Sequence, residues 1–126
     1  MQQTSPQAYL IIQFAGRWTD VLCLQRQPII VGRSSDNQIV VHDERVSRQH
    51  AAVEPLSGGW QVRDLGSRNG TQLNDITLDQ PHELNEGETI GVGGCRITFC
   101  TSLNAGFTAN RRLNEASPGD GAESEP

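Results

Sequence analysis

Three short polar segments of the sequence carry side chains that can bind an anion. The first is Gly32-Arg33-Ser34-Ser35, the second is 45–50, and the third is 64–71. Between them they hold four arginines, namely Arg33, Arg45, Arg48 and Arg68. Guanidinium forks, hydroxyls and amides that converge on one concavity suit a phosphate, and suit a carboxylate less well. If the fold brings the three segments together, these residue types predict a phosphate-binding site.

The rest of the chain has the pattern of short β-strands. In 9–14 the apolar residues alternate, which places Leu10, Ile12 and Phe14 on one face. Further apolar stretches are 21–24, 29–31, 39–41, 51–53, 60–62, 72–73, 89–92 and 95–99. Turn-forming residues such as Ser57-Gly58-Gly59 separate them, and no window has a clear helical stripe. The pattern predicts an all-β sandwich or barrel, in which loops gather at the ends and are held by a rigid scaffold.

Length and composition limit the possible functions. The 126 residues make one domain, and a net charge of −5 excludes a generally basic protein that coats nucleic acid. All ten basic residues are arginine, which excludes a lysine-nucleophile enzyme. No apolar run reaches the ~18 residues of a membrane helix. We therefore expect no membrane association. Three cysteines do not form a disulfide framework, so we expect a reducing, cytoplasmic setting.

The organisation along the chain follows from the same composition. Residues 1–7 are polar and predict a flexible lead-in, and residues 8–100 hold the apolar stretches and predict the folded domain. Residues 101–126 are rich in Ser, Gly, Asn, Ala and acids. Such a segment buries too little apolar surface to offset its ordering entropy, which predicts a disordered acidic tail or linker.

The polar segments occur in the order and at the spacing of a known family. The combination of Gly32-Arg33, Ser47-Arg48-Gln49-His50 and 66–71 resembles the forkhead-associated (FHA) domain, and Asn74 and 84–91 extend the resemblance. It implies an FHA-like β-sandwich of about eleven short strands with functional loops at one end. It also implies a phosphothreonine-peptide-binding signalling module that recognises phosphorylated partner proteins of Ser/Thr kinase pathways and is not an enzyme.

The resemblance assigns the phosphate contacts to particular residues. Arg33 looks like the arginine that meets the phosphate, and Ser47 looks like the serine whose hydroxyl donates to it. Arg48 and Arg68 stand where the family often adds phosphate contacts, although Thr or Ser is frequent at the position of Arg68.

The remaining assignments concern the peptide and the shape of the loops. Asn69 looks like the asparagine that holds the backbone of the bound peptide. Arg45 stands where the family can read a side chain downstream of the phosphothreonine. Gly32, His50 and Gly70 are the expected structural residues of the site, and Asn69-Gly70 is a strong turn dipeptide in its own right.

Three other interpretations remain. A phospho-independent assembly or scaffold module on the same fold would bind through a strand face or sheet edge. A hydrolase triad of Ser47, His50 and Asp64 is disfavoured because Ser47 lies in a polar loop without a nucleophile-elbow pattern. A zinc site is disfavoured because Cys95 and Cys100 stand at an odd offset on one expected strand, so that Cys100 faces outward. We therefore expect no metal and no cofactor.

Overall fold

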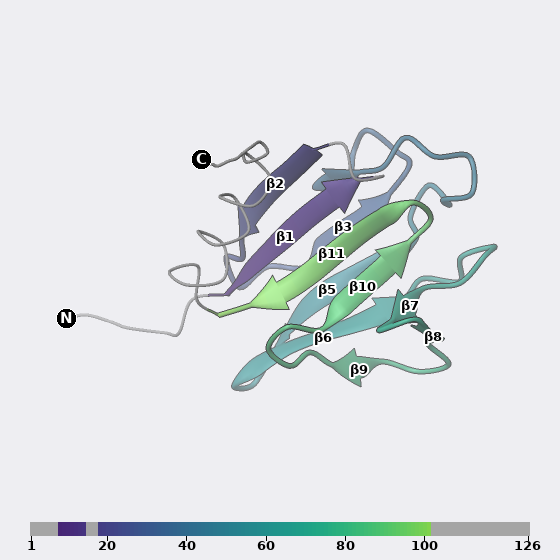
Figure 1. Cartoon of the computed structure of the whole chain (residues 1–126). Coiled ribbons are helices and arrows are strands. Elements are labelled where there is room, and N and C mark those ends of the chain that lie inside the picture. The colour runs from purple at the N-terminus through teal and green to yellow at the C-terminus, as the bar shows by residue number, and fades with distance from the viewer. Residues whose placement is uncertain (1–7, 15–17, 102–126) are drawn as a thin grey trace, which may run out of the picture. The chain divides into compact units, whose positions relative to one another are not determined.

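The computed structural model describes residues 8–14 and 18–101, and its described elements are all β-strands. The strands are β1 (Tyr9–Phe14), β2 (Trp18–Cys23), β3 (Ile29–Gly32), β4 (Ile39–Val40), β5 (Ala51–Leu56), β6 (Gly59–Asp64), β7 (Gln72–Leu73), β8 (Ile76–Thr77), β9 (His82–Glu83), β10 (Thr89–Val92) and β11 (Cys95–Cys100). They form two sheets that face each other (Figure 1). The predicted β-sandwich of about eleven short strands is confirmed.

The strands of each sheet are mostly antiparallel neighbours. The six-stranded sheet has the order β2-β1-β11-β10-β7-β8, and the five-stranded sheet has the order β4-β3-β5-β6-β9. Only β3 and β4 pair in parallel among the described ladders. The first described strand pairs with the last, with Tyr9 opposite Cys100 and Phe14 opposite Cys95. The start of β1 and the end of β11 therefore lie side by side, at the left of Figure 1.

The inner faces of the two sheets enclose one hydrophobic core. Its fully buried side chains include Leu10, Val31, Val53, Val62, Ile90 and Ile97, and Trp60 is 7% exposed. These residues alternate with outward-facing ones along their strands, as the period of two in the sequence predicts. The core belongs to a compact unit that spans Ala8–Cys100.

The last strand corrects one sequence expectation. Cys95 lies in the core, where burial raises the pKa of its thiol to about 11. Cys100 lies outside the core cluster, but it is only 6% exposed rather than open to solvent. On this face of the sheet Cys100 lies directly opposite Tyr9 of the neighbouring strand β1.

Two further points separate the structure from the sequence expectations. The edge strands β8 and β9 were not expected, because two exposed residues each carry no alternation of apolar side chains. The predicted lead-in 1–7 and tail 101–126 lie outside the described residues, except for Thr101. Within residues 8–14 and 18–101 no helix is long and apolar enough to cross a membrane.

Neighbouring strand ends carry the three polar segments. In the five-stranded sheet Val31 pairs with Ala51, and Ala51 pairs with Asp64 on its other side. The end of β3, the start of β5 and the end of β6 therefore lie next to one another. Since each polar segment adjoins one of these strand ends, the sheet brings all three to one edge.

Candidate functional site

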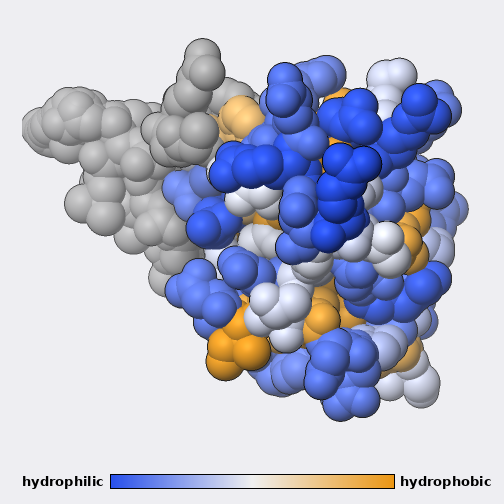
Figure 2. All heavy atoms as spheres, turned by 90° about the vertical axis from the view of Figure 1, so that its right-hand side faces the viewer, coloured by the Kyte–Doolittle hydropathy of each residue, from blue (hydrophilic) through white to orange (hydrophobic). Residues whose placement is uncertain are grey.

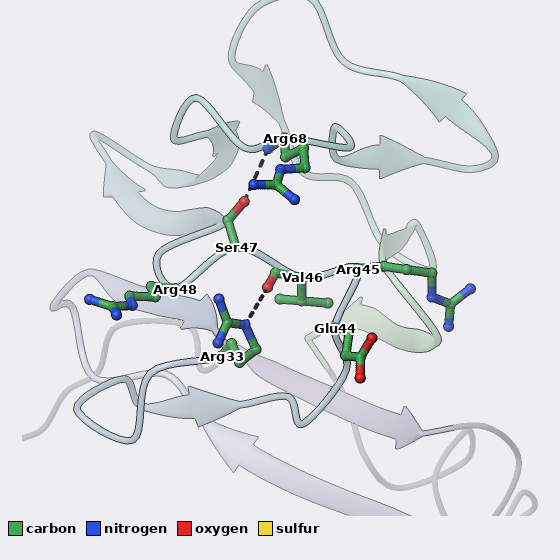
Figure 3. A pocket seen from close by; sticks show the side chains of 7 residues that line it. All are labelled: Arg33, Glu44, Arg45, Val46, Ser47, Arg48 and Arg68. Atoms are coloured by element: carbon green, nitrogen blue, oxygen red, sulfur yellow. Dashed lines mark hydrogen bonds between the residues drawn. The ribbon is translucent and has the colours of Figure 1, made fainter.

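The three polar segments meet in a pocket with a volume of about 160 Å³ (Figure 3). Its lining comprises Arg33, Glu44, Arg45, Val46, Ser47, Arg48 and Arg68. The structure therefore brings together five of the six residues predicted to contact a phosphopeptide. The sixth, Asn69, follows Arg68 directly and does not line the pocket. The end of the molecule seen in Figure 2 is mainly hydrophilic, with a few hydrophobic side chains exposed.

Arg33 leaves β3 with its backbone and side chain both fixed. Its backbone N–H donates to the Ser47 carbonyl at 2.9 Å, and its Nε donates to the Val46 carbonyl at 2.9 Å. Within the described part of the chain, no hydrogen bond engages the two terminal nitrogens of its guanidinium. Arg33 is therefore an oriented cation whose outer fork is available to a ligand.

Ser47 accepts and donates in different directions. Its Oγ accepts the backbone N–H of Arg68 at 3.0 Å, which ties the second polar segment to the third. Its own backbone N–H donates to Nδ1 of His50 at 3.0 Å. Because the hydroxyl oxygen is already an acceptor, its hydrogen is left to donate to an anion in the pocket.

His50 is fully buried and uses both ring nitrogens. Nδ1 accepts from the Ser47 backbone, so the hydrogen lies on Nε2, which donates to the Gly70 carbonyl at 2.7 Å. The ring is thus a neutral bridge between two loops and has no free lone pair for the Ser47 hydroxyl. The carboxylate of Asp64 bonds elsewhere, so the three residues do not form a catalytic triad.

Asp64 closes the loop that follows β6. Its carboxylate accepts from the backbone N–H groups of Gly66 and Ser67 at 2.9 Å each, from Ser67 Oγ at 2.5 Å and from Thr71 Oγ1 at 2.7 Å. Burial opposes ionisation, but these bonds outweigh it and hold the pKa of Asp64 below its ordinary value. Gly70, with φ of 85°, completes the turn in a conformation that favours glycine.

Gly32 is required by a close approach between two loops. A Cβ there would overlap the Arg48 carbonyl and would lie 2.8 Å from Nδ2 of Asn37. The same carbonyl accepts from Asn37 Nδ2 at 2.6 Å and from the Ser34 backbone at 3.2 Å. Gly32 therefore allows the segment that carries Arg48 to lie against the end of β3.

Arg45 is held from both sides by residues outside the pocket. The Asp43 carboxylate accepts from its Nε at 3.0 Å and from its Nη2 at 2.6 Å, and also from the Gly94 backbone at 2.9 Å. These bonds keep the pKa of Asp43 well below its usual range. Nδ2 of Asn69 donates to the Arg45 carbonyl at 2.7 Å. Asn69 thus braces the loop through one hydrogen and keeps a second hydrogen and its Oδ1.

The arginines do not all face the centre of the pocket. In Figure 3 the guanidinium of Arg68 lies beside the Ser47 hydroxyl, whereas Arg48 and Arg45 extend away in opposite directions. The geometry therefore divides the predicted contacts into a central group of Arg33, Ser47 and Arg68 and two outer arginines.

The sequence did not reveal three residues that shape this site. Glu44 lines the pocket, Asp43 holds Arg45, and Asn37 holds the Arg48 carbonyl. The only available signal for Glu44 and Asp43 was their place in the chain, directly before Arg45. In residues 8–14 and 18–101 no group of three or more His, Cys, Asp or Glu side chains is placed to hold a metal ion.

Comparison with known proteins gives a consistent result. The FHA domain model matches residues 29–93. FHA domain-containing protein FhaB of Mycolicibacterium smegmatis is 33% identical over 72 residues, which are 57% of this chain and 46% of FhaB. The chain spans about half the length of the curated relatives it matches, with 46% and 57% for two FhaB proteins.

Solved structures are similar over most of the described chain. The structure of Mycobacterium tuberculosis EmbR in complex with a low affinity phosphopeptide has a TM-score of 0.68 at 31% identity, and covers 76% of this chain and 24% of that one. A structure from a study of phosphothreonine-dependent FHA domain interactions has a TM-score of 0.66 at 26% identity, and covers 75% and 97% of the two chains.

Proposed function

Since the chain belongs to the FHA domain family, we propose that it is a phosphothreonine-peptide-binding signalling module that recognises phosphorylated partner proteins. Its ligands would be threonine-phosphorylated proteins of a Ser/Thr kinase pathway in the cytoplasm. Recognition is an equilibrium event without turnover, and residues 8–100 are the part that carries it.

One observation supports this proposal above the others. Three donors without a protein acceptor among the described residues converge on one pocket: the outer nitrogens of Arg33, the Ser47 hydroxyl and the Arg68 guanidinium. A phosphothreonine carries about −1.5 to −2 charges and three acceptor oxygens, which match such a set of donors. A hydrolase needs a base beside Ser47, and both nitrogens of His50 are engaged by backbone groups.

The outer residues have secondary roles in the proposal. Arg48 strengthens the positive field at the pocket mouth, and Arg45 faces the peptide beyond the phosphate. Asn69 bonds the peptide backbone through its Oδ1 and remaining hydrogen. Gly32, His50 and Gly70 fix the loops so that the donors are oriented before the ligand arrives, which lowers the entropic cost of binding.

The test is a calorimetric titration with one peptide in two forms. The peptide is selected from a phosphothreonine library and is then synthesised with and without the phosphate. We expect binding of the phosphorylated form, weaker binding at higher salt, and no measurable binding of the unphosphorylated form. Equal binding of both forms would overturn the proposal and favour the phospho-independent scaffold module.

A further inference from the structure

Glu44 is the one carboxylate among the residues that line the pocket. It lies directly before Arg45 in the loop, and in Figure 3 it stands between Arg33 and Arg45. Its side chain is exposed. A negative charge here is unexpected, because it repels the phosphate that the neighbouring arginines attract.

Glu44 is not neutralised by the arginines around it. The two ion pairs of the described residues are Arg45 with Asp43 and Arg63 with Glu54. Among those residues, no hydrogen bond engages the Glu44 carboxylate either. Arg45, the nearest cation in sequence, is held by Asp43 at 2.6 Å and extends away from the pocket. The pocket therefore presents a free carboxylate beside its free cations.

From this arrangement we propose that Glu44 is a specificity-determining residue that pairs with a basic side chain of the phosphopeptide close to the phosphothreonine. A lysine or arginine there meets Glu44 on one side and the peptide's own phosphate on the other, so both repulsions are relieved together. An acidic residue at the same place meets two like charges. The proposal rests on the proposed function, since it concerns the same pocket.

The experiment compares the wild-type domain with Glu44→Gln, which removes the charge and keeps the shape of the side chain. Both are titrated with a set of phosphothreonine peptides in which each position, from three before to three after the phosphothreonine, is Lys, Ala or Glu in turn. The matched control is Glu83→Gln, which makes the same charge change on the exposed edge strand β9, outside the pocket lining.

We expect the wild type and Glu83→Gln to bind the Lys peptide about two- to fivefold more tightly than the Glu peptide at one position, the range of an exposed ion pair. Glu44→Gln should lose that preference at that position and keep the profile elsewhere. An unchanged profile overturns the proposal, and so does an equal gain for every peptide, because Glu44 would then act on the phosphate alone. If the wild type ignores the phosphate itself, the proposed function fails, and this proposal fails with it.

Discussion

Two layers of the site differ in how their polar groups are satisfied. The inner frame, made of Gly32, His50 and the partly buried Asp64, places its polar atoms against partners within the protein. The contact surface, made of Arg33, Ser47, Arg48, Arg68 and Glu44, keeps donors and one carboxylate without protein partners among the described residues.

This division shows how a binding site made of loops can keep a defined conformation. Loops carry little apolar surface, and here Val46 is the member of the second polar segment that packs in the core, so much of the loop conformation must come from hydrogen bonds within the protein. The frame supplies these bonds, and the surface can then hold its donors ready for an anion. Substitutions in the frame should therefore cost mainly stability, whereas substitutions on the surface should cost mainly binding.

The largest expected effect is that of His50→Ala. The change leaves a cavity and deprives the Ser47 N–H and the Gly70 carbonyl of their partner. We expect a loss of about 2–4 kcal/mol in the free energy of unfolding, measured by urea denaturation. His82→Ala, an exposed histidine on β9, is the control and should change little. If the two variants are equally stable, the hydrogen bonds of His50 do not stabilise the loops.

The next largest effect is expected for a residue of the contact surface, and it concerns phosphopeptide affinity. Arg33→Ala removes the oriented guanidinium, and hydrogen bonds to a charged group are worth roughly 1.5–3 kcal/mol each. Phosphopeptide affinity should fall roughly ten- to hundredfold in a calorimetric titration. Circular dichroism should show a folded protein, because Arg33 is exposed. Arg26→Ala changes an exposed arginine between β2 and β3 and should bind normally. Normal binding by Arg33→Ala would mean that the phosphate lies elsewhere.

The stability of the protein at acid pH should depend on the ionisation of Asp64. Since its pKa is lowered in the folded protein from an ordinary 3.8, ionised Asp64 contributes stability above that value, and the contribution is lost as the pH falls through the folded pKa. We expect the free energy of unfolding to fall less steeply below pH ~4 in Asp64→Asn than in the wild type. Asp79→Asn, an exposed loop change, should keep the wild-type slope. A wild-type slope in Asp64→Asn would contradict the role of Asp64.

The smallest effect is expected at Arg45, on the rim between the two layers. An acidic residue about three positions after the phosphothreonine should strengthen binding by ~0.2–1 kcal/mol, because the pair is exposed and Asp43 already shares the arginine. Arg45→Glu should reverse this preference on a peptide array and keep the dependence on phosphate. An unchanged array profile would assign Arg45 to the loop structure alone.

The sequence predicted which polar residues adjoin neighbouring strand ends, and their roles in binding stay a prediction. Arg33, Ser47 and Arg68 lie together because β3, β5 and β6 are neighbours, and the short apolar stretches 29–31, 51–53 and 60–62 predict those strands. The resemblance to the FHA domain then assigned these three residues to one phosphate-binding site. Only the fold class was available from periodicity alone, since a period of two does not distinguish a sandwich from a barrel.

The remaining features depend on which atoms meet across loops. Nothing in the spacing shows that Asp43 rather than a phosphopeptide would hold the Arg45 guanidinium, or that Asn69 would donate to the Arg45 carbonyl. For the same reason the sequence did not predict that Glu44 lines the pocket, because this depends on the path of the loop. Strands β8 and β9 could not be predicted for a different reason, because two residues are too few to show a period.

The pairing of β1 with β11 has a consequence for how such a domain can be built into other proteins. Tyr9 and Cys100 lie side by side at one end of the sheet, and the turn before Cys95 reaches Asp43 beside the pocket at the other end. The polypeptide thus enters and leaves about 17 Å from the binding loops. Because the two ends of Ala8–Cys100 lie this close together, at the end of the sheet away from the pocket, the domain can be inserted into a surface loop of a host protein.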